Sequence, residues 1–179
     1  IEIIIDTEED SRIILEGDTI SFLDLSTQTP TSWQWTFEGG TPESSSEQNP
    51  QVVYNNAGSY SVTLTAENST SRTSQTFNGY ITVYAPAHAD FTFDHDTIGE
   101  NHSVNFTSTS TGATSLLWTF EGGNPETSTE ENPQVTYTSE GVYSVSLTAS
   151  NPVSSDTYTV TNAIVVNDVA ENKSNSANI

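Results

Sequence analysis

The chain has 179 residues, and 24 acidic residues against 3 basic ones give it a formal net charge of −21 at pH 7. Nucleic-acid binding needs clusters of Lys and Arg, and an anionic membrane surface would repel this charge, so both partners are excluded. There is no Cys, and no apolar run approaches the roughly 18 residues of a membrane span, so we expect no disulfide and no membrane insertion.

The expected elements are strands, because apolar and polar residues alternate and almost nothing repeats at 3.6 residues. In the first half of the chain they cover residues 2–6, 19–24, 33–37, 51–54, 60–66 and 77–84. In the second half they cover residues 90–94, 103–107, 116–120, 134–137, 143–149 and 158–166. Ser, Thr, Asn, Gly and Pro fill the gaps. Short strands joined by such turns predict an all-β sandwich.

One hexapeptide, Trp-Thr-Phe-Glu-Gly-Gly, occurs at residues 35–40 and again at 118–123, 83 positions later. When residues 35–68 are laid on 118–151 without a gap, 23 of the 34 positions are identical. A repeat of this length is a domain that folds by itself, not a solenoid unit. We expect domains at 1–84 and 90–167, a short linker at 85–89, and a C-terminal linker or tail at 168–179.

The repeated stretch carries a recognisable pattern. In the first unit it consists of Trp35, Phe37, Gly40, Asn49, Pro50, Tyr54, Gly58, Tyr60, Val62, Leu64, Ala66 and Asn68, and residues 118–151 repeat it. This pattern resembles the PKD domain, named for polycystic kidney disease protein, over nearly all of both units. The resemblance implies two tandem immunoglobulin-like β-sandwich domains, found outside cells, as in secreted bacterial proteins.

The sequence departs from the family at the turn after the aromatic residues. The family commonly has Trp-x-Phe-Gly-Asp-Gly, whereas this chain has Glu38-Gly39-Gly40 and Glu121-Gly122-Gly123. The acidic group is shifted by one position, so no role of the family's Asp is carried over. We interpret the two glutamates as turn residues beside glycines that can adopt positive φ.

The aromatic residues of the repeat are expected to specify the fold. Tyr60 and Tyr143 stand two residues before Val62 and Val145, where antibody-type domains carry their second Cys, and this is the place of a tyrosine corner. The inward Trp of each unit then packs on aliphatic side chains in place of a disulfide. The expected fold residues are Trp35, Phe37, Tyr60, Trp118, Phe120 and Tyr143.

The sequence does not indicate an enzyme. Catalysis needs a nucleophile with a base, or an acid and base pair, converging in a pocket. His88, His95 and His102 occur only in the second unit, and the first unit has no His at all. We therefore interpret all three as surface residues.

Two acidic clusters are candidate calcium sites. One consists of Asp90, Asp94, Asp96 and Glu100, and the other of Asp6, Glu8, Glu9 and Asp10. Hard oxygen ligands suit Ca²⁺, and the resemblance adds that PKD domains of some secreted enzymes bind calcium near the interdomain joint. No EF-hand spacing is present, and a solvated acidic loop is the alternative. Calcium is the only cofactor that the sequence suggests.

Trp33 is the only Trp without a copy, because Leu116 takes its place in the second unit. An exposed Trp could stack on a sugar ring or a polymeric substrate, as resemblance to PKD domains of chitinases and collagen-degrading proteases would allow. Trp33 shares the parity of Trp35, however, and its Leu counterpart favours a core position. Trp33 is thus a candidate substrate-binding residue with a core role as the alternative.

Two functional hypotheses follow. The first is a non-catalytic, monomeric, extracellular module that spaces and positions neighbouring domains of a longer secreted or surface-attached protein. The second is an accessory module of a secreted hydrolase that binds a polysaccharide or a fibrous protein. Because the chain starts at Ile1 and ends in a polar run, we interpret it as a piece of something longer.

Overall fold

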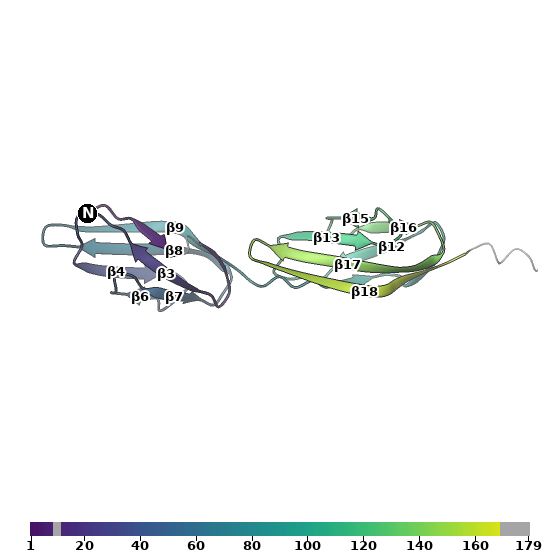
Figure 1. The fold of residues 1–179 in the computed structure, drawn as a ribbon, viewed down its shortest axis with the longest axis horizontal. Helices are drawn as coiled ribbons and strands as arrows, with labels where there is room; N and C mark the ends of the chain where they lie inside the picture. The colour runs from purple at the N-terminus through teal and green to yellow at the C-terminus, as the bar shows by residue number, and fades with distance from the viewer. Residues whose placement is uncertain (9–11, 169–179) are drawn as a thin grey trace, which may run out of the picture. The chain divides into compact units, whose positions relative to one another are not determined.

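The computed structural model describes residues 1–8 and 12–168, and its contacts divide the chain into two units, Ile1–Ala85 and Pro86–Ile179. The described part of each unit is built of strands and turns (Figure 1). Within these ranges no helix is long and apolar enough to cross a membrane. Glu9, Asp10 and all of the expected tail except Asp168 lie outside the described residues.

The first unit forms two sheets. Its strands are β1 (Ile5–Thr7), β2 (Ile13–Leu15), β3 (Thr19–Asp24), β4 (Ser32–Phe37), β5 (Gly40–Thr41), β6 (Ser44–Ser45), β7 (Gln51–Tyr54), β8 (Gly58–Glu67) and β9 (Arg72–Tyr84). One sheet has the order β1-β3-β7-β5 and the other β2-β9-β8-β4-β6. All neighbours are antiparallel except β2 and β9, which run parallel.

The second unit repeats this topology strand for strand. Its strands are β10 (Phe91–Phe93), β11 (Thr97–Gly99), β12 (His102–Ser108), β13 (Ser115–Phe120), β14 (Gly123–Asn124), β15 (Thr127–Ser128), β16 (Gln134–Tyr137), β17 (Gly141–Asn151) and β18 (Ser154–Asn167). The sheets have the orders β10-β12-β16-β14 and β11-β18-β17-β13-β15, with β11 parallel to β18. The predicted fold class, an all-β pair of sandwiches, is confirmed.

The longer strands lie where alternation predicts them. β3, β7 and β16 have the predicted bounds, whereas β9 begins five residues before its predicted start and β18 four residues before. The short strands β2, β5 and β6 and their counterparts were missed, because two or three residues do not establish a period.

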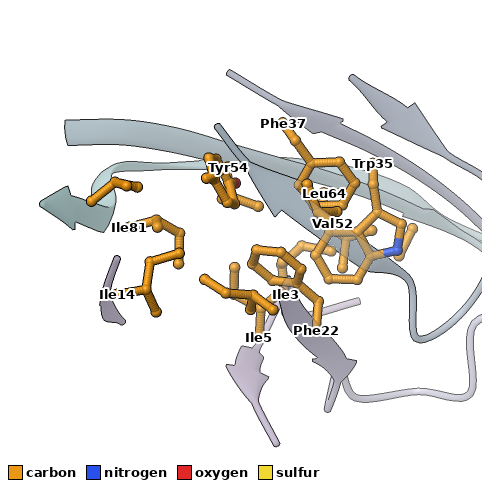
Figure 2. Packing of buried hydrophobic residues seen from close by; sticks show 14 residues of the cluster. Ile3, Ile5, Ile14, Phe22, Trp35, Phe37, Val52, Tyr54, Leu64 and Ile81 are labelled. Carbon is orange, nitrogen blue, oxygen red and sulfur yellow. The ribbon is translucent and has the colours of Figure 1, made fainter. Parts of the chain in front are cut away.

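Each core lies between the two sheets of its unit. In the first unit Phe22 comes from one sheet and Trp35 and Phe37 from the other, and the three rings lie within 6 Å of one another, centroid to centroid. Figure 2 shows this packing together with Val52 and Leu64. In the second unit Phe106, Trp118 and Phe120 repeat the arrangement. Both tryptophans are fully buried.

Residues 87–89, which the sequence analysis places in the linker, are bonded to the second unit. Ala87 N donates to Ser154 Oγ and Ala89 N to Asp156 Oδ2, both at 2.8 Å, and His88 forms a β-bridge with Thr111. Ala89 is buried.

The hexapeptide glycines lie against the tyrosine corner. Tyr60 Oη donates to the carbonyl oxygens of Asn56 and Ala57, at 2.9 and 3.3 Å, which ties down the loop before β8. The ring lies against Gly39, whose φ is +66°. Tyr143 and Gly122 repeat this contact. Any side chain at Gly39 would adopt a strained backbone and collide with the ring.

We predict that Gly39→Ala destabilises the protein by about 3 kcal/mol, since left-handed strain adds to the collision with Tyr60. Gly17→Ala is the matched control, because Gly17 also has positive φ but open space around its Cα, and it should cost only about 1–2 kcal/mol. Equilibrium urea denaturation measures both. Equal losses for the two variants would contradict the role of the ring contact.

Candidate functional site

The hexapeptide glutamates serve the fold. Glu38 follows the last residue of β4 and lies opposite Ser61 of β8, next to the point where the register of β8 on β9 shifts between Tyr60 and Val62. Glu38 Oε2 accepts the Ser61 amide at 3.0 Å, and the Glu38 amide donates to Ser61 O at 3.1 Å. This amide bond to the carboxylate lowers the pKa of Glu38. Glu121 and Ser144 make the same pair of bonds in the second unit.

Asp94 is the most strongly perturbed acid of the candidate calcium clusters. The Asn105 side chain donates to its carboxylate at 2.7 Å, and the Asn105 amide donates at 3.0 Å. His95 Nδ1 lies 3.1 Å from Asp94 Oδ1, the oxygen that also accepts the Asn105 amide. The side-chain bond from Asn105, followed by the amide bond and His95, lowers the pKa of Asp94 to about 2.

The other acids of this cluster have separate partners. Asp90 accepts the amide of Phe91 at 2.8 Å, and Glu100 accepts the amide of Glu140 at 3.1 Å. The Asp96 carbonyl accepts the Val165 amide, while its side chain is exposed. Glu100 has a counterpart in Glu16, which accepts the Ala57 amide at 2.7 Å. The bond made by Glu100 is therefore a repeated loop support.

In the first unit, Asp6 accepts the amide of Thr7 and pairs with Arg12 at 3.1 Å, and these two contacts lower its pKa. Glu8 is exposed and donates its amide to Ser21 O. The other two residues of this predicted cluster lie outside the described part. Within residues 1–8 and 12–168 no group of three or more His, Asp or Glu side chains could hold a metal ion. Calcium binding stays a prediction.

The three histidines lie at the surface with different partners. His88 Nδ1 is 3.2 Å from Asp156 Oδ2, and His95 contacts Asp94. His102 Nδ1 lies 3.0 Å from the carbonyl oxygen of Glu100. These contacts are local, and they do not bring the three rings to one acid–base centre.

Trp33 makes a contact that the sequence analysis missed. Its indole N–H donates to Asp24 Oδ2 at 2.6 Å, and Asp24 is 9% exposed and also accepts the Ser26 amide. The rest of the Trp33 ring packs half-buried against the core. The second unit has Ser108 in place of Asp24 and Leu116 in place of Trp33. The two copies therefore differ at both partners of this contact, and that paired difference was the signal in the sequence from which the contact could have been predicted.

A groove of about 680 Å³ opens beside Trp33 on the first unit. β6 pairs only with Trp35 and Thr36, so the edge of β4 before them has no strand partner in the described structure. The groove lies there, and its walls include Gln34, Thr65 and the loosely paired Glu67 and Arg72, 3.9 Å apart. The hollow beside Leu116 is smaller, about 310 Å³.

Comparison with known proteins defines the family. The PKD domain family matches residues 7–80 and 90–164, and the chain belongs to this family as a tandem pair of domains. Among solved structures, murine CEACAM1b is similar with a TM-score of 0.57 at 15% identity, over 93% of this chain and 100% of that one. No curated protein matches the sequence.

Two further structures have the same fold. The complex titled "mouse coronavirus receptor-binding domain complexed with its murine receptor" contains a chain with a TM-score of 0.58 at 16% identity, and the match covers 92% of this chain and 100% of that one. Drosophila OTK, extracellular domains 3–5, has a TM-score of 0.57 at 13% identity, over 93% of this chain and 62% of that one. At these identities the likeness shows the immunoglobulin-like fold alone.

We predict that Asp94→Asn lowers the melting temperature near neutral pH but not at pH 2. The folded-state pKa of Asp94 is depressed to about 2, so its carboxylate stabilises the fold above its unfolded pKa of about 4 and loses this effect as pH falls toward 2. Thermal unfolding of both proteins between pH 2 and 7 measures the difference. A difference in melting temperature between the two proteins that stays constant from pH 2 to 7 would contradict the prediction.

Proposed function

We propose that the chain is a non-catalytic, monomeric, extracellular spacer that positions neighbouring domains of a secreted or surface-attached protein and carries tension between them. The proposal is supported by the pairing of the second strand of each unit with its last strand. β2 lies near the start of the first unit and β9 ends it, and the two run parallel with Ile13, Ile14 and Leu15 opposite Thr82, Val83 and Tyr84.

Parallel pairing at the two ends of a unit resists pulling. When the ends are drawn apart, β2 and β9 slide in opposite directions, so their hydrogen bonds are loaded together instead of opening one at a time. The bonds that flank this patch are Thr82 N to Arg12 O at 2.8 Å and Glu16 N to Tyr84 O at 2.9 Å. In the second unit Val165 N donates to Asp96 O at 2.7 Å and Glu100 N to Asn167 O at 3.2 Å.

Other observations agree with a spacer. Small domains of this size have little room for a deep catalytic cavity, and the hollows described above are open and polar. The net charge of −21 keeps such a module soluble and separate from other acidic surfaces. The extracellular location is supported by the family and by neighbours such as the OTK extracellular domains.

We predict that Thr82→Pro lowers the force needed to unfold one of the two units in single-molecule pulling of the whole chain. Proline removes the N–H that donates to Arg12 O, at a position where this group faces β2 and not β8. Thr82→Val keeps the N–H and is the control. The second unit, unchanged, provides an internal standard. If both variants unfold at the wild-type force, the strand patch does not carry tension and the proposal loses its support.

A second candidate function, binding of a polysaccharide or a fibrous protein as an accessory module of a secreted hydrolase, is favoured by the groove beside Trp33. Its walls offer hydroxyl and amide groups next to an indole that Asp24 holds in place. Such a combination of an aromatic ring and polar groups suits a sugar ring or an extended peptide. The second unit, with Leu116, lacks this combination.

The test replaces Trp33 and Asp24 with the residues that the second unit has at the same positions. Trp33→Leu with Asp24→Ser removes the indole and its acceptor together, so no buried carboxylate is left unpaired. Pull-down on chitin, cellulose and collagen should show wild-type retention that the double variant loses, and Leu116→Ala should leave it unchanged. Retention that survives in the double variant would refute binding in this groove.

A further inference from the structure

The outer face of the five-stranded sheet in the second unit carries a grid of hydroxyl groups. Three residues each from β13, β17 and β18 point away from the core and lie opposite one another in three rows. The rows are Thr119, Ser146 and Thr159; Leu117, Thr148 and Thr157; and Ser115, Ser150 and Ser155. Eight of the nine positions are Ser or Thr, and none is charged. Thr127 of β15 extends the first row.

The hydroxyls of this grid bond across the strands. Thr148 Oγ1 lies 2.8 Å from Thr157 Oγ1, and Ser115 Oγ lies 2.9 Å from Ser150 Oγ. Since each hydroxyl can donate once and accept twice, every pair still has capacity toward solvent. The exception, Leu117, is 51% exposed in the middle row, beside Thr148. Strand geometry sets the groups roughly 4.8 Å apart across the sheet and about 6.8 Å apart along it.

The corresponding face of the first unit differs at the same places. Its rows are Thr36, Thr63 and Thr76; Gln34, Thr65 and Ser74; and Ser32, Glu67 and Arg72. Gln34 stands where the second unit has Leu117. The last row is charged where the second unit has Ser150 and Ser155. Only the second unit therefore combines an uncharged face with an exposed apolar residue in its middle row.

This combination suits a neutral sugar polymer. A pyranose ring has hydroxyls at its rim and C–H groups on its face, which match the Ser and Thr side chains and Leu117 respectively. No carboxylate of the grid has to be desolvated when such a ligand binds. An anionic ligand would find no cation in the grid and would be repelled by the chain's overall charge.

A protein partner fits the grid less well. The nine positions span roughly 10 Å by 14 Å between Cα atoms, whereas a stable protein interface takes about 800 Å² from each partner. Protein interfaces are also centred on aromatic or Arg anchors, and the grid has one Leu. We propose that the outer face of β13, β17 and β18 binds neutral polysaccharide chains.

This inference goes beyond the spacer function and uses no residue of the Trp33 groove. The experiment is affinity electrophoresis and pull-down of the full chain on cellulose, chitin, xylan, mannan and β-1,3-glucan, with alginate as an anionic comparison. Leu117→Asp places a carboxylate in the middle row of the grid without touching the core. Thr157→Glu does so at a second exposed position. Gln34→Asp is the matched control at the equivalent position of the first unit.

We expect retention on at least one neutral polymer, a loss of at least tenfold in Leu117→Asp and in Thr157→Glu, and no change in Gln34→Asp, at unchanged melting temperature. The proposal is overturned if no neutral polymer retains the wild type, or if both grid variants bind as it does. Loss only in the Trp33 variant would assign binding to the groove. Sedimentation showing a dimer that Leu117→Asp dissociates, without polysaccharide binding, would assign the face to a second copy.

Discussion

The pairing of the hexapeptide glutamate with β8 or β17, just past the end of β4 or β13, is the constraint on which each unit depends. The backbone N–H and C=O of Ser61 face Glu38 beyond the end of β4, and a Ser61 amide left unpaired there would cost free energy. Glu38 accepts that amide, and Gly39, next in the chain, leaves room for the ring of Tyr60, whose hydroxyl secures the preceding loop. The aromatic half of the hexapeptide fills the core, and its Glu-Gly half completes the pairing at the end of β4 and makes room for the tyrosine ring. This division explains why the whole stretch is kept in both copies.

Much of the fold could be predicted from the sequence because alternation is strong where a strand is long and half-buried. The strand at Thr19–Asp24 followed from that pattern, and the family resemblance supplied the immunoglobulin-like sandwich architecture. The parallel pairing of β2 with β9 and of β11 with β18 could not be predicted. Edge strands of three residues show no period, and their partners lie about 70 residues away in the sequence. The role of Glu38 was also missed, because the Ser61 amide that needs an acceptor beyond the end of β4 can be identified only when the register of β4 on β8 is known.

The candidate sites were less predictable than the fold. Acidic residues close in sequence suggested calcium, but Asp94, Asp90 and Glu100 each bond to a different amide or side chain. Proximity in sequence does not make these carboxylates converge, because Asp90 and Asp94 flank β10 and Glu100 follows β11, and the two strands belong to different sheets. Trp33 was ambiguous because parity places it inward, and only the structure reveals Asp24 as its acceptor. The differences between the copies proved more informative than the shared residues.

The scarcity of basic residues, and the position of two of them in or beside paired strands, has a consequence for resistance to proteolysis. Proteases of trypsin-like specificity cut after Lys or Arg, and the described chain offers them two arginines. The carbonyl of Arg12, which such an enzyme would attack, accepts the amide of Thr82, and Arg72 is paired with Glu67 across the β8–β9 hairpin. At these two arginines a cleavable extended backbone is therefore available only after a strand has left its sheet. At Arg12 the protecting bond is the one from Thr82, which belongs to the patch that we propose carries tension.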